Sequence, residues 1–269
     1  MNIHRVTFTV FACAAIAAAQ DKMTVPLSNP SQPATVKVNL ISGGMTITGG
    51  GPAGQVSVES ARGQRETERM RRGVPEGMHR IDMGAASLNI EEAHNVVTIG
   101  SGSDGRGGNV IIQVPTNTSL QLQAVNGGKI EVTGVNGDLE IENVNGSVEL
   151  KNVSGSVVAS SQNGSVVASL DRVTPNKPMS FTSLNGKIDV TIPADTKARL
   201  RLKTDNGAVY SDFDVKMEPD ATKPTVEDSR SSDGKYRIRM DRSVYGSING
   251  GGPEYRFETM NGNIIIHKK

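Results

Sequence analysis

The chain has little of several residue types, and each shortage excludes a class of protein. Cys13 is the one cysteine among 269 residues, which rules out an intramolecular disulfide framework and a cysteine-rich zinc site. Tryptophan is absent and aromatic residues make up 3% of the chain. The formal net charge is +1, so the whole chain offers no electrostatic basis for binding nucleic acid. Beyond the N-terminal segment, no apolar stretch reaches the roughly 20 residues of a membrane-spanning helix.

The N-terminal segment has the form of an export signal. Arg5 is followed by the apolar run Val6–Ala19, which ends in three alanines, a small-residue pattern typical of a cleavage site. We therefore predict that residues 1–19 are a signal peptide and that the protein is exported to the periplasm or cell surface. A lipoprotein acylated at Cys13 is the alternative. It is disfavoured because Phe11 fits a lipidation box poorly and the preceding apolar stretch is short.

A repeat of nine residues fills the region 126–170. Apolar side chains stand two and four positions after each glycine of the repeat, and this period of two indicates β-strands. Asn-Gly or Ser-Gly before most strands favours a turn, because glycine accepts positive φ and asparagine tolerates it. Further Asn-Gly pairs follow at wider spacing. The predicted turn glycines are Gly128, Gly137, Gly146, Gly155, Gly164, Gly186, Gly207 and Gly262.

Two all-β folds fit this repeat. Asn-Gly between alternating runs is typical of hairpins, which would give an antiparallel meander. A short fixed period with equivalent residues in register instead favours a β-solenoid or β-roll, in which each coil stacks on the last. A further apolar residue seven positions after the glycine, at Val135, Val144 and Val153, suits a coil whose corner must fill the core. We predict the solenoid, with two repeats as a possible length for one coil.

The same alternation of apolar and polar residues extends over most of the chain. We therefore predict a single β-repeat domain over residues 35–269. Residues 20–34 contain three prolines and are predicted to be a linker. Residues 214–234 are polar, contain two prolines and are predicted to be a surface loop.

Three patterns that can carry chemistry are present only in part. Gly100–Gly105 spells GxGxxG, but a strand at Val110–Ile112 follows where a dinucleotide site needs a helix. The turns offer uncharged Asn and Ser rather than the carboxylates that calcium prefers. Glu131, Glu140 and Glu149 lie in mid-strand, where we expect them to face solvent with lysines nearby. We predict no catalytic residue, no cofactor and no metal site, and hence a protein that is not an enzyme.

The densest charge lies in residues 61–80. Guanidinium groups pair bidentately with phosphate, so this segment is a candidate contact for an envelope polyanion such as lipopolysaccharide or teichoic acid. The alternative is a charged, solvated loop. The candidate contact residues are Arg62, Arg65, Arg69, Arg71 and Arg72.

The C-terminal phrase GSINGGGPEYRFETMNGNIIIHKK carries a family resemblance. It contains Asn249–Pro253, the alternating pair Tyr255 and Phe257, and then Thr259–Gly262. This phrase, with the Asn-Gly repeats, resembles the closing signature of a bacterial extracytoplasmic family labelled "putative adhesin". The resemblance implies a β-strand-repeat fold outside the cytoplasm, and it implies no catalytic residues and no known ligand.

These observations favour a non-enzymatic extracytoplasmic or cell-envelope protein, an interaction or adhesin-like scaffold of unknown ligand. Its expected partner is a cell-envelope component or another envelope protein, and not nucleic acid. One alternative is a β-helix enzyme that acts on envelope polysaccharide. The other is a purely structural spacer. The sequence leaves the oligomeric state and the handedness of the coil open.

Overall fold

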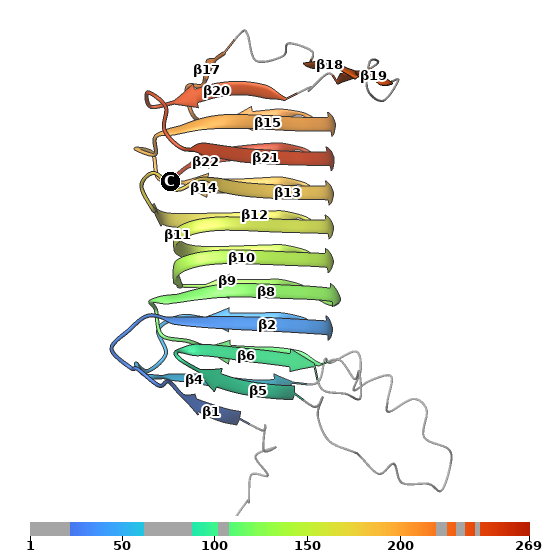
Figure 1. Cartoon of the computed structure of the whole chain (residues 1–269). Helices are drawn as coiled ribbons and strands as arrows, with labels where there is room; N and C mark the ends of the chain where they lie inside the picture. Colours follow the sequence, from blue (N-terminus) through green and yellow to red (C-terminus); the bar gives the residue numbers. More distant parts are fainter. Residues whose placement is uncertain (1–21, 62–87, 102–107, 219–224, 230–234, 240–242) are drawn as a thin grey trace, which may run out of the picture.

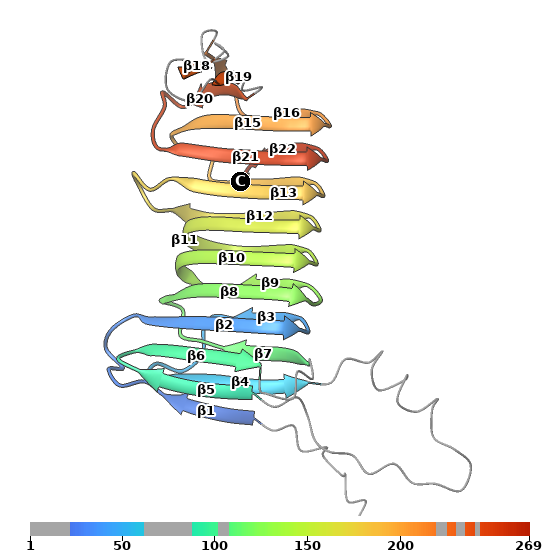
Figure 2. The same ribbon diagram turned by 45° about the vertical axis from the view of Figure 1, so that its right-hand side comes forward.

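The protein is described by a computed structural model for residues 22–61, 88–101, 108–218, 225–229, 235–239 and 243–269. Every regular element in these ranges is a β-strand. The strands are stacked as rungs in two layers, which face each other across an apolar interior (Figures 1 and 2). The prediction of an all-β fold is confirmed.

One layer, here called the front sheet, lies toward the viewer in Figure 1. Its central strands are parallel to one another, and antiparallel strands close it at both ends. In spatial order the front sheet contains β5 (Leu88–Ala93), β6 (Val96–Ser101), β2 (Ala34–Ser42), β8 (Thr118–Asn126), β10 (Asn136–Asn145), the second half of β11 (Val148–Asn163), β13 (Met179–Asn185), β21 (Glu254–Asn261), β15 (Ala198–Asn206), β20 (Val244–Ile248) and β17 (Lys216–Met217).

The other layer, the back sheet, is formed by the return strands of the same coils. In spatial order it contains β1 (Lys22–Pro26), β4 (Gln55–Ala61), β7 (Asn109–Gln113), β3 (Met45–Thr48), β9 (Ile130–Thr133), the first half of β11, β12 (Val166–Val173), β14 (Ile188–Ile192), β22 (Ile264–Lys268) and β16 (Val209–Ser211). A separate antiparallel hairpin joins β18 (Thr225–Ser229) to β19 (Lys235–Arg239).

Two nine-residue repeats make one full coil of the β-solenoid. Val148 pairs with Ile130 of one neighbouring coil and with Val166 of the other, so equivalent residues are 18 positions apart. These pairings are parallel, which excludes the antiparallel meander. The solenoid prediction is confirmed because parallel neighbours need a return path, and the opposite sheet supplies it.

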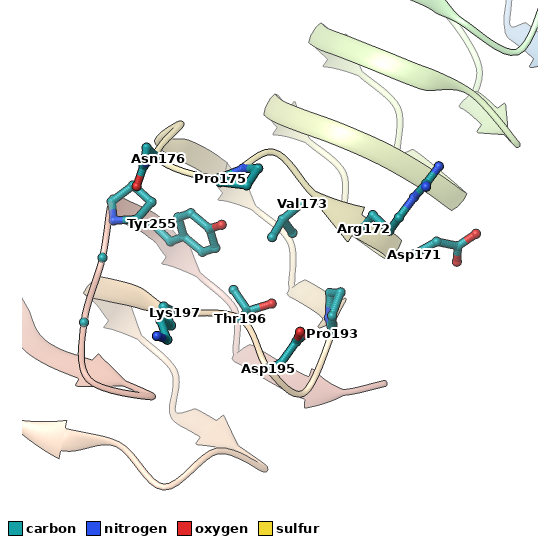
Figure 3. A pocket seen from close by; sticks show the side chains of 13 residues that line it. Asp171, Arg172, Val173, Pro175, Asn176, Pro193, Asp195, Thr196, Lys197 and Tyr255 are labelled. Carbon is teal, nitrogen blue, oxygen red and sulfur yellow. The ribbon is translucent and has the colours of Figure 1, made fainter.

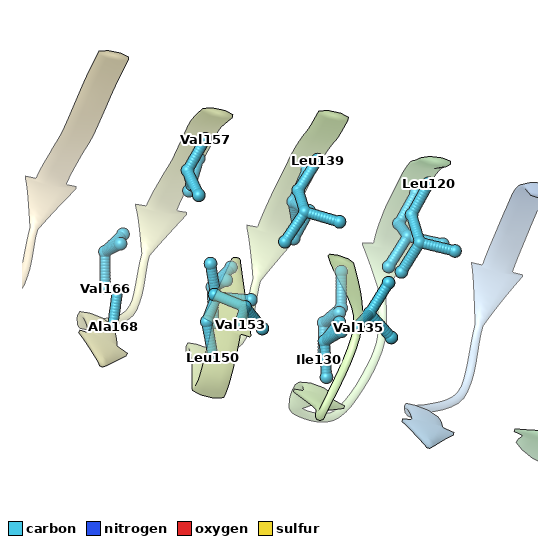
Figure 4. Packing of buried hydrophobic residues seen from close by; sticks show 14 of the residues in the cluster. Leu120, Ile130, Val135, Leu139, Leu150, Val153, Val157, Val166 and Ala168 are labelled. Carbon is cyan, nitrogen blue, oxygen red and sulfur yellow. The ribbon is translucent and has the colours of Figure 1, made fainter. Parts of the chain in front are cut away.

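The apolar residues of the period-two pattern point between the two sheets (Figure 4). Val135 and Val153, seven positions after a repeat glycine, are buried at one corner, as predicted. Val144 occupies the same repeat position but is half-buried at the outer face of the front sheet. The prediction fails for Val144 because the two corners of an 18-residue coil are unequal, so alternate repeats place this residue differently. Further along, the core contains larger side chains, and Phe181 and Phe257 stack with ring centroids 5.3 Å apart.

The order of coils in space departs from chain order near both ends of the stack. The β2–β3 coil lies between the β6–β7 coil and the β8–β9 coil. The β21–β22 coil, the last in the chain, lies between the β13–β14 and β15–β16 coils. The C-terminal strands are therefore interior rungs, with hydrogen-bonded neighbours on both sides.

Two predicted irregular segments contain ordered strands. The predicted linker, residues 20–34, includes β1, which pairs with β4, and the buried residue Leu27. Its prolines lie at the end of a strand and in a turn, so they do not prevent pairing. The predicted surface loop, residues 214–234, includes β17 and β18. The predicted signal peptide, residues 1–19, lies outside the described residues.

Candidate functional site: the two edges of the solenoid

Each coil has two edges of different character. At the edge on the right in Figure 1, here called the tight-turn edge, the chain passes from the front sheet to the back sheet through a short turn. At the opposite edge, here called the loop edge, it returns to the front sheet. The predicted turn glycines Gly128, Gly146, Gly164, Gly186, Gly262 and Gly207 lie at the tight-turn edge, whereas Gly137 and Gly155 lie at the loop edge.

Apart from Gly128, whose Cβ would make an ordinary contact with Gly44, the predicted turn glycines of the tight-turn edge leave no space for a side chain. A Cβ atom at Gly146 would overlap the carbonyl oxygen of Gly128, and one at Gly164 would overlap that of Gly146. The same relation continues from Gly164 to Gly186 and from Gly186 to Gly262. Glycine is therefore required by the close approach of successive backbones at this edge.

Side chains from the neighbouring coil satisfy the carbonyl groups of these glycines. The Ser161 hydroxyl donates to the Gly146 carbonyl at 2.9 Å, and the Ser183 hydroxyl donates to the Gly164 carbonyl at 2.9 Å. The Thr259 hydroxyl donates likewise to the Gly186 carbonyl. All three side chains are buried, so each hydrogen bond prevents an unpaired polar group beneath the turn.

The asparagines before the glycines form a continuous ladder of side-chain amides. The Asn163 amide donates to the Asn145 side-chain oxygen at 2.9 Å and accepts from Asn185 at 3.0 Å. The ladder continues through Asn261 to Asn206, with links of 2.7 and 2.8 Å, and reaches Asn126 from Asn145 at 3.3 Å. These asparagines join neighbouring turns and place no negative charge there.

The outer face of the back sheet carries a network of ion pairs. Glu131 and Glu149 lie on paired positions of β9 and β11, and Lys129 and Lys151 each contact both carboxylates. Hydrogen bonds from Lys151 and Lys129 hold the pKa of Glu131 below its usual value. Within the described ranges, no three His, Cys, Asp or Glu side chains are grouped so that they could hold a metal ion.

The loop edge contains a hollow of about 540 Å³ (Figure 3). It lies where three connections meet: residues 171–176, 193–197 and 251–253. Val173, Tyr255 and three prolines give it apolar walls, and burial raises the pKa of the Tyr255 hydroxyl to about 12.

Charges of both signs surround this hollow. Arg172, Asp195 and Lys197 are exposed at its rim, whereas Asp171 is engaged by Lys269. The arginines that the sequence predicts as partner contacts lie outside the described residues; they are Arg62, Arg65, Arg69, Arg71 and Arg72.

The residues of the hollow could not be grouped from the sequence because they come from three connections separated by about 20 and 55 positions along the chain. The family phrase, residues 246–269, supplies Gly251–Pro253 near its beginning and Tyr255 to the hollow. The second connection, residues 193–197, lies in a phrase that begins Ile192-Pro193 and is echoed at Val114-Pro115, whereas no repeated motif spans residues 171–176.

None of the elements in the described ranges is a helix of the length and apolarity required to cross a membrane. A protein-family model described as "Toastrack DUF4097" matches residues 4–267. None of the curated proteins matches the chain.

The chain is also similar to two solved structures. One is a "putative cell adhesion protein" from Clostridium sporogenes, at 12% identity, 93% coverage of this chain, 100% coverage of that chain and a TM-score of 0.45. The other is a "putative adhesin" from Bacteroides fragilis, at 9% identity, 93% coverage of this chain, 98% coverage of that chain and a TM-score of 0.30.

Proposed function

The chain belongs to the Toastrack DUF4097 family, and from this premise we propose that it is a non-enzymatic, extracytoplasmic, adhesin-like scaffold. In this proposal the solenoid is a rigid support and the loop edge binds an envelope component. The export signal predicted in residues 1–19 supports the location. The predicted absence of enzymatic activity is part of the proposal.

The hollow at the loop edge is the observation that carries this function. Its volume of about 540 Å³ lies within the range of small-ligand sites, roughly 300–1,000 Å³. Its rim residues Arg172, Asp195 and Lys197 are exposed, so the packing of the coils does not depend on them. Charged side chains that stability does not require, placed on loops of a rigid framework, are typical of a binding site.

The chemistry of the hollow favours an anionic envelope saccharide. The proline and valine side chains offer apolar walls to the faces of sugar rings, while Arg172 and Lys197 offer cations to carboxylate or phosphate substituents. The predicted arginine contacts at residues 62–72 would recognise the same class of anion. Both groups of cations support one ligand class.

Co-sedimentation of the purified chain with envelope fractions of its source organism, at low and high salt, tests this proposal. We expect salt-sensitive binding that falls at least several-fold when Arg172→Ala and Lys197→Ala are combined. The matched control combines Lys22→Ala with Lys187→Ala, which removes the same charge from exposed positions on β1 and at the tight-turn edge.

Each alternative has its own outcome in this experiment. Equal loss in both double variants would show unspecific charge attraction and contradict a site at the hollow. Absence of binding to every fraction would leave a structural spacer. Release of soluble saccharide during the incubation would instead support the polysaccharide-acting enzyme.

A further inference from the structure

The front sheet exposes a file of apolar side chains on its outer face, beside the asparagine ladder. Val125, Leu184 and Met260, each one position before a ladder residue, are exposed, and so is Ile41, which is aligned with Val125. Ile41 is exposed at 56% and Met260 at 46%. Val144 is the half-buried fifth member. We call these five residues the apolar file.

The register of the strands places these residues on adjacent rungs. Strands β2, β8, β10, β11, β13, β21 and β15 are consecutive neighbours, and Gln162 and Asp205 fill the two positions of this row that are not apolar. At about 4.8 Å per strand the row is about 29 Å long. The apolar residues of this row form two groups, Ile41 to Val144 and Leu184 with Met260, and exposed apolar groups of this kind are a feature of interaction surfaces.

The same face carries opposite charges on the two sides of β13. On β10, two strands away, Glu140 and Glu142 are exposed, and their carboxylates accept only long hydrogen bonds of 3.4 and 3.5 Å from glutamine side chains. On β15, two strands away in the other direction, Arg201 and Lys203 face outward. Between them the outward residues of β13 are uncharged, namely Ser180, Thr182 and Leu184. On β21, which separates β13 from β15, Arg256 and Glu258 pair with each other, and Glu258 also contacts Lys203.

We propose that two copies of the chain pack front sheet against front sheet, about a two-fold axis that runs along β13. This axis reverses the stacking order, so β10 of each copy faces β15 of the other. Glu140 and Glu142 then lie opposite Arg201 and Lys203, and Leu184 lies opposite its own copy. The alternative two-fold axis, along the stack, would place Glu140 and Glu142 against themselves.

The size of the face meets the requirement for a stable dimer. The seven strands centred on β13, from β8 to β20, lie about 4.8 Å apart; at about nine residues each and about 3.3 Å per residue they cover about 1,000 Å² per copy. Specific interfaces bury about 800 Å² per partner. Two facing sheets of the same spacing also match rung for rung at a separation of about 10 Å, as in a β-sandwich.

Sedimentation velocity of the full chain from 1 to 100 µM tests the proposed dimer. We expect the unmodified chain to form a dimer. The dissociation constant should be at least tenfold higher for the single variant Leu184→Asp and for the double variant Glu140→Lys, Glu142→Lys. Mixing the latter variant with Arg201→Glu, Lys203→Glu should restore association as a heterodimer. The matched control is Ile111→Asp, at a 38% exposed position of the back sheet, and it should leave the dimer unchanged.

Thermal unfolding of each variant separates a folding defect from a lost interface, because Arg201 and Lys203 also make contacts within the chain. Leu184 is exposed, so Leu184→Asp tests the interface without removing a contact of Arg201 or Lys203 within the chain. A monomer at 100 µM would overturn the proposal. So would a dimer that survives both Leu184→Asp and the glutamate reversal.

Discussion

The two edges of the solenoid are built from the same coils, yet they follow different rules. At the tight-turn edge successive turns repeat one arrangement of asparagine, glycine and a buried hydrogen-bond donor. At the loop edge the connections range from the short corner 134–135 to the longer segments 174–178 and 193–197. Close backbone stacking constrains residue type along the whole tight-turn edge. At the loop edge it does so at some positions, such as Gly155 and Gly252, while the longer connections leave room for the hollow.

The largest expected effect compares one glycine at each edge. Gly146→Ala would drive a Cβ into the carbonyl oxygen of Gly128, so we expect a loss of more than about 2 kcal/mol in the free energy of unfolding. Gly250→Ala, at the loop edge, has open space around its Cβ and suffers only from a φ of +89°, worth about 1 kcal/mol. Denaturant unfolding of both variants measures the difference, and equal losses would contradict the close-stacking account.

A smaller effect is expected within the asparagine ladder. Asn163→Ala removes one hydrogen bond to Asn145 and one from Asn185, and we expect a loss of about 1–2 kcal/mol. Gln162→Ala, at the exposed neighbouring position, should change stability by less than about 0.5 kcal/mol. If chemical denaturation gives the same midpoint for both variants, the side-chain hydrogen bonds of the ladder do not contribute to the stability of the fold.

The smallest expected effect concerns the ion pairs on the outer face of the back sheet, between the two edges. Because the pKa of Glu131 is lowered in the folded state, its ion pairs stabilise the fold above its unfolded pKa of about 4.5 and lose that contribution as pH falls through the folded value. Glu131→Gln should therefore cost less than about 1 kcal/mol at pH 7 and less still at pH 3. Melting temperatures of the unmodified chain and of Glu131→Gln between pH 3 and pH 7 measure the change. A difference between the two proteins that is larger at pH 3 than at pH 7 would contradict the predicted pH dependence.

The repeat made the fold predictable where the coils follow chain order. Asn-Gly turns and period-two alternation indicated a parallel stack of two-repeat coils around Gly146, and this is correct. The same pattern could not give the position of the β21–β22 coil, because every coil presents the same type of edge to its neighbours. Insertion between β13–β14 and β15–β16 is decided by pairing and core contacts such as the stack of Phe181 on Phe257.

The candidate site was less predictable than the fold. The hollow depends on three connections brought together by the stacking, and Arg172, Asp195 and Lys197 share no motif. Val144 shows the limit of the repeat itself, since identical repeat positions alternate between a buried corner and the apolar file. Arg62 and the other predicted arginine contacts lie outside the described residues and stay a prediction.

The most direct test of this division between edges is hydrogen exchange of the chain, alone and with the solubilised envelope fraction that binds it. The account predicts new protection in peptides that cover residues 171–178, 193–197 and 249–253. Peptides that cover the turns at Gly146, Gly164 and Gly186 should be protected already and should not change. Ligand-dependent protection confined to those turns, with no change at the loop edge, would contradict the account.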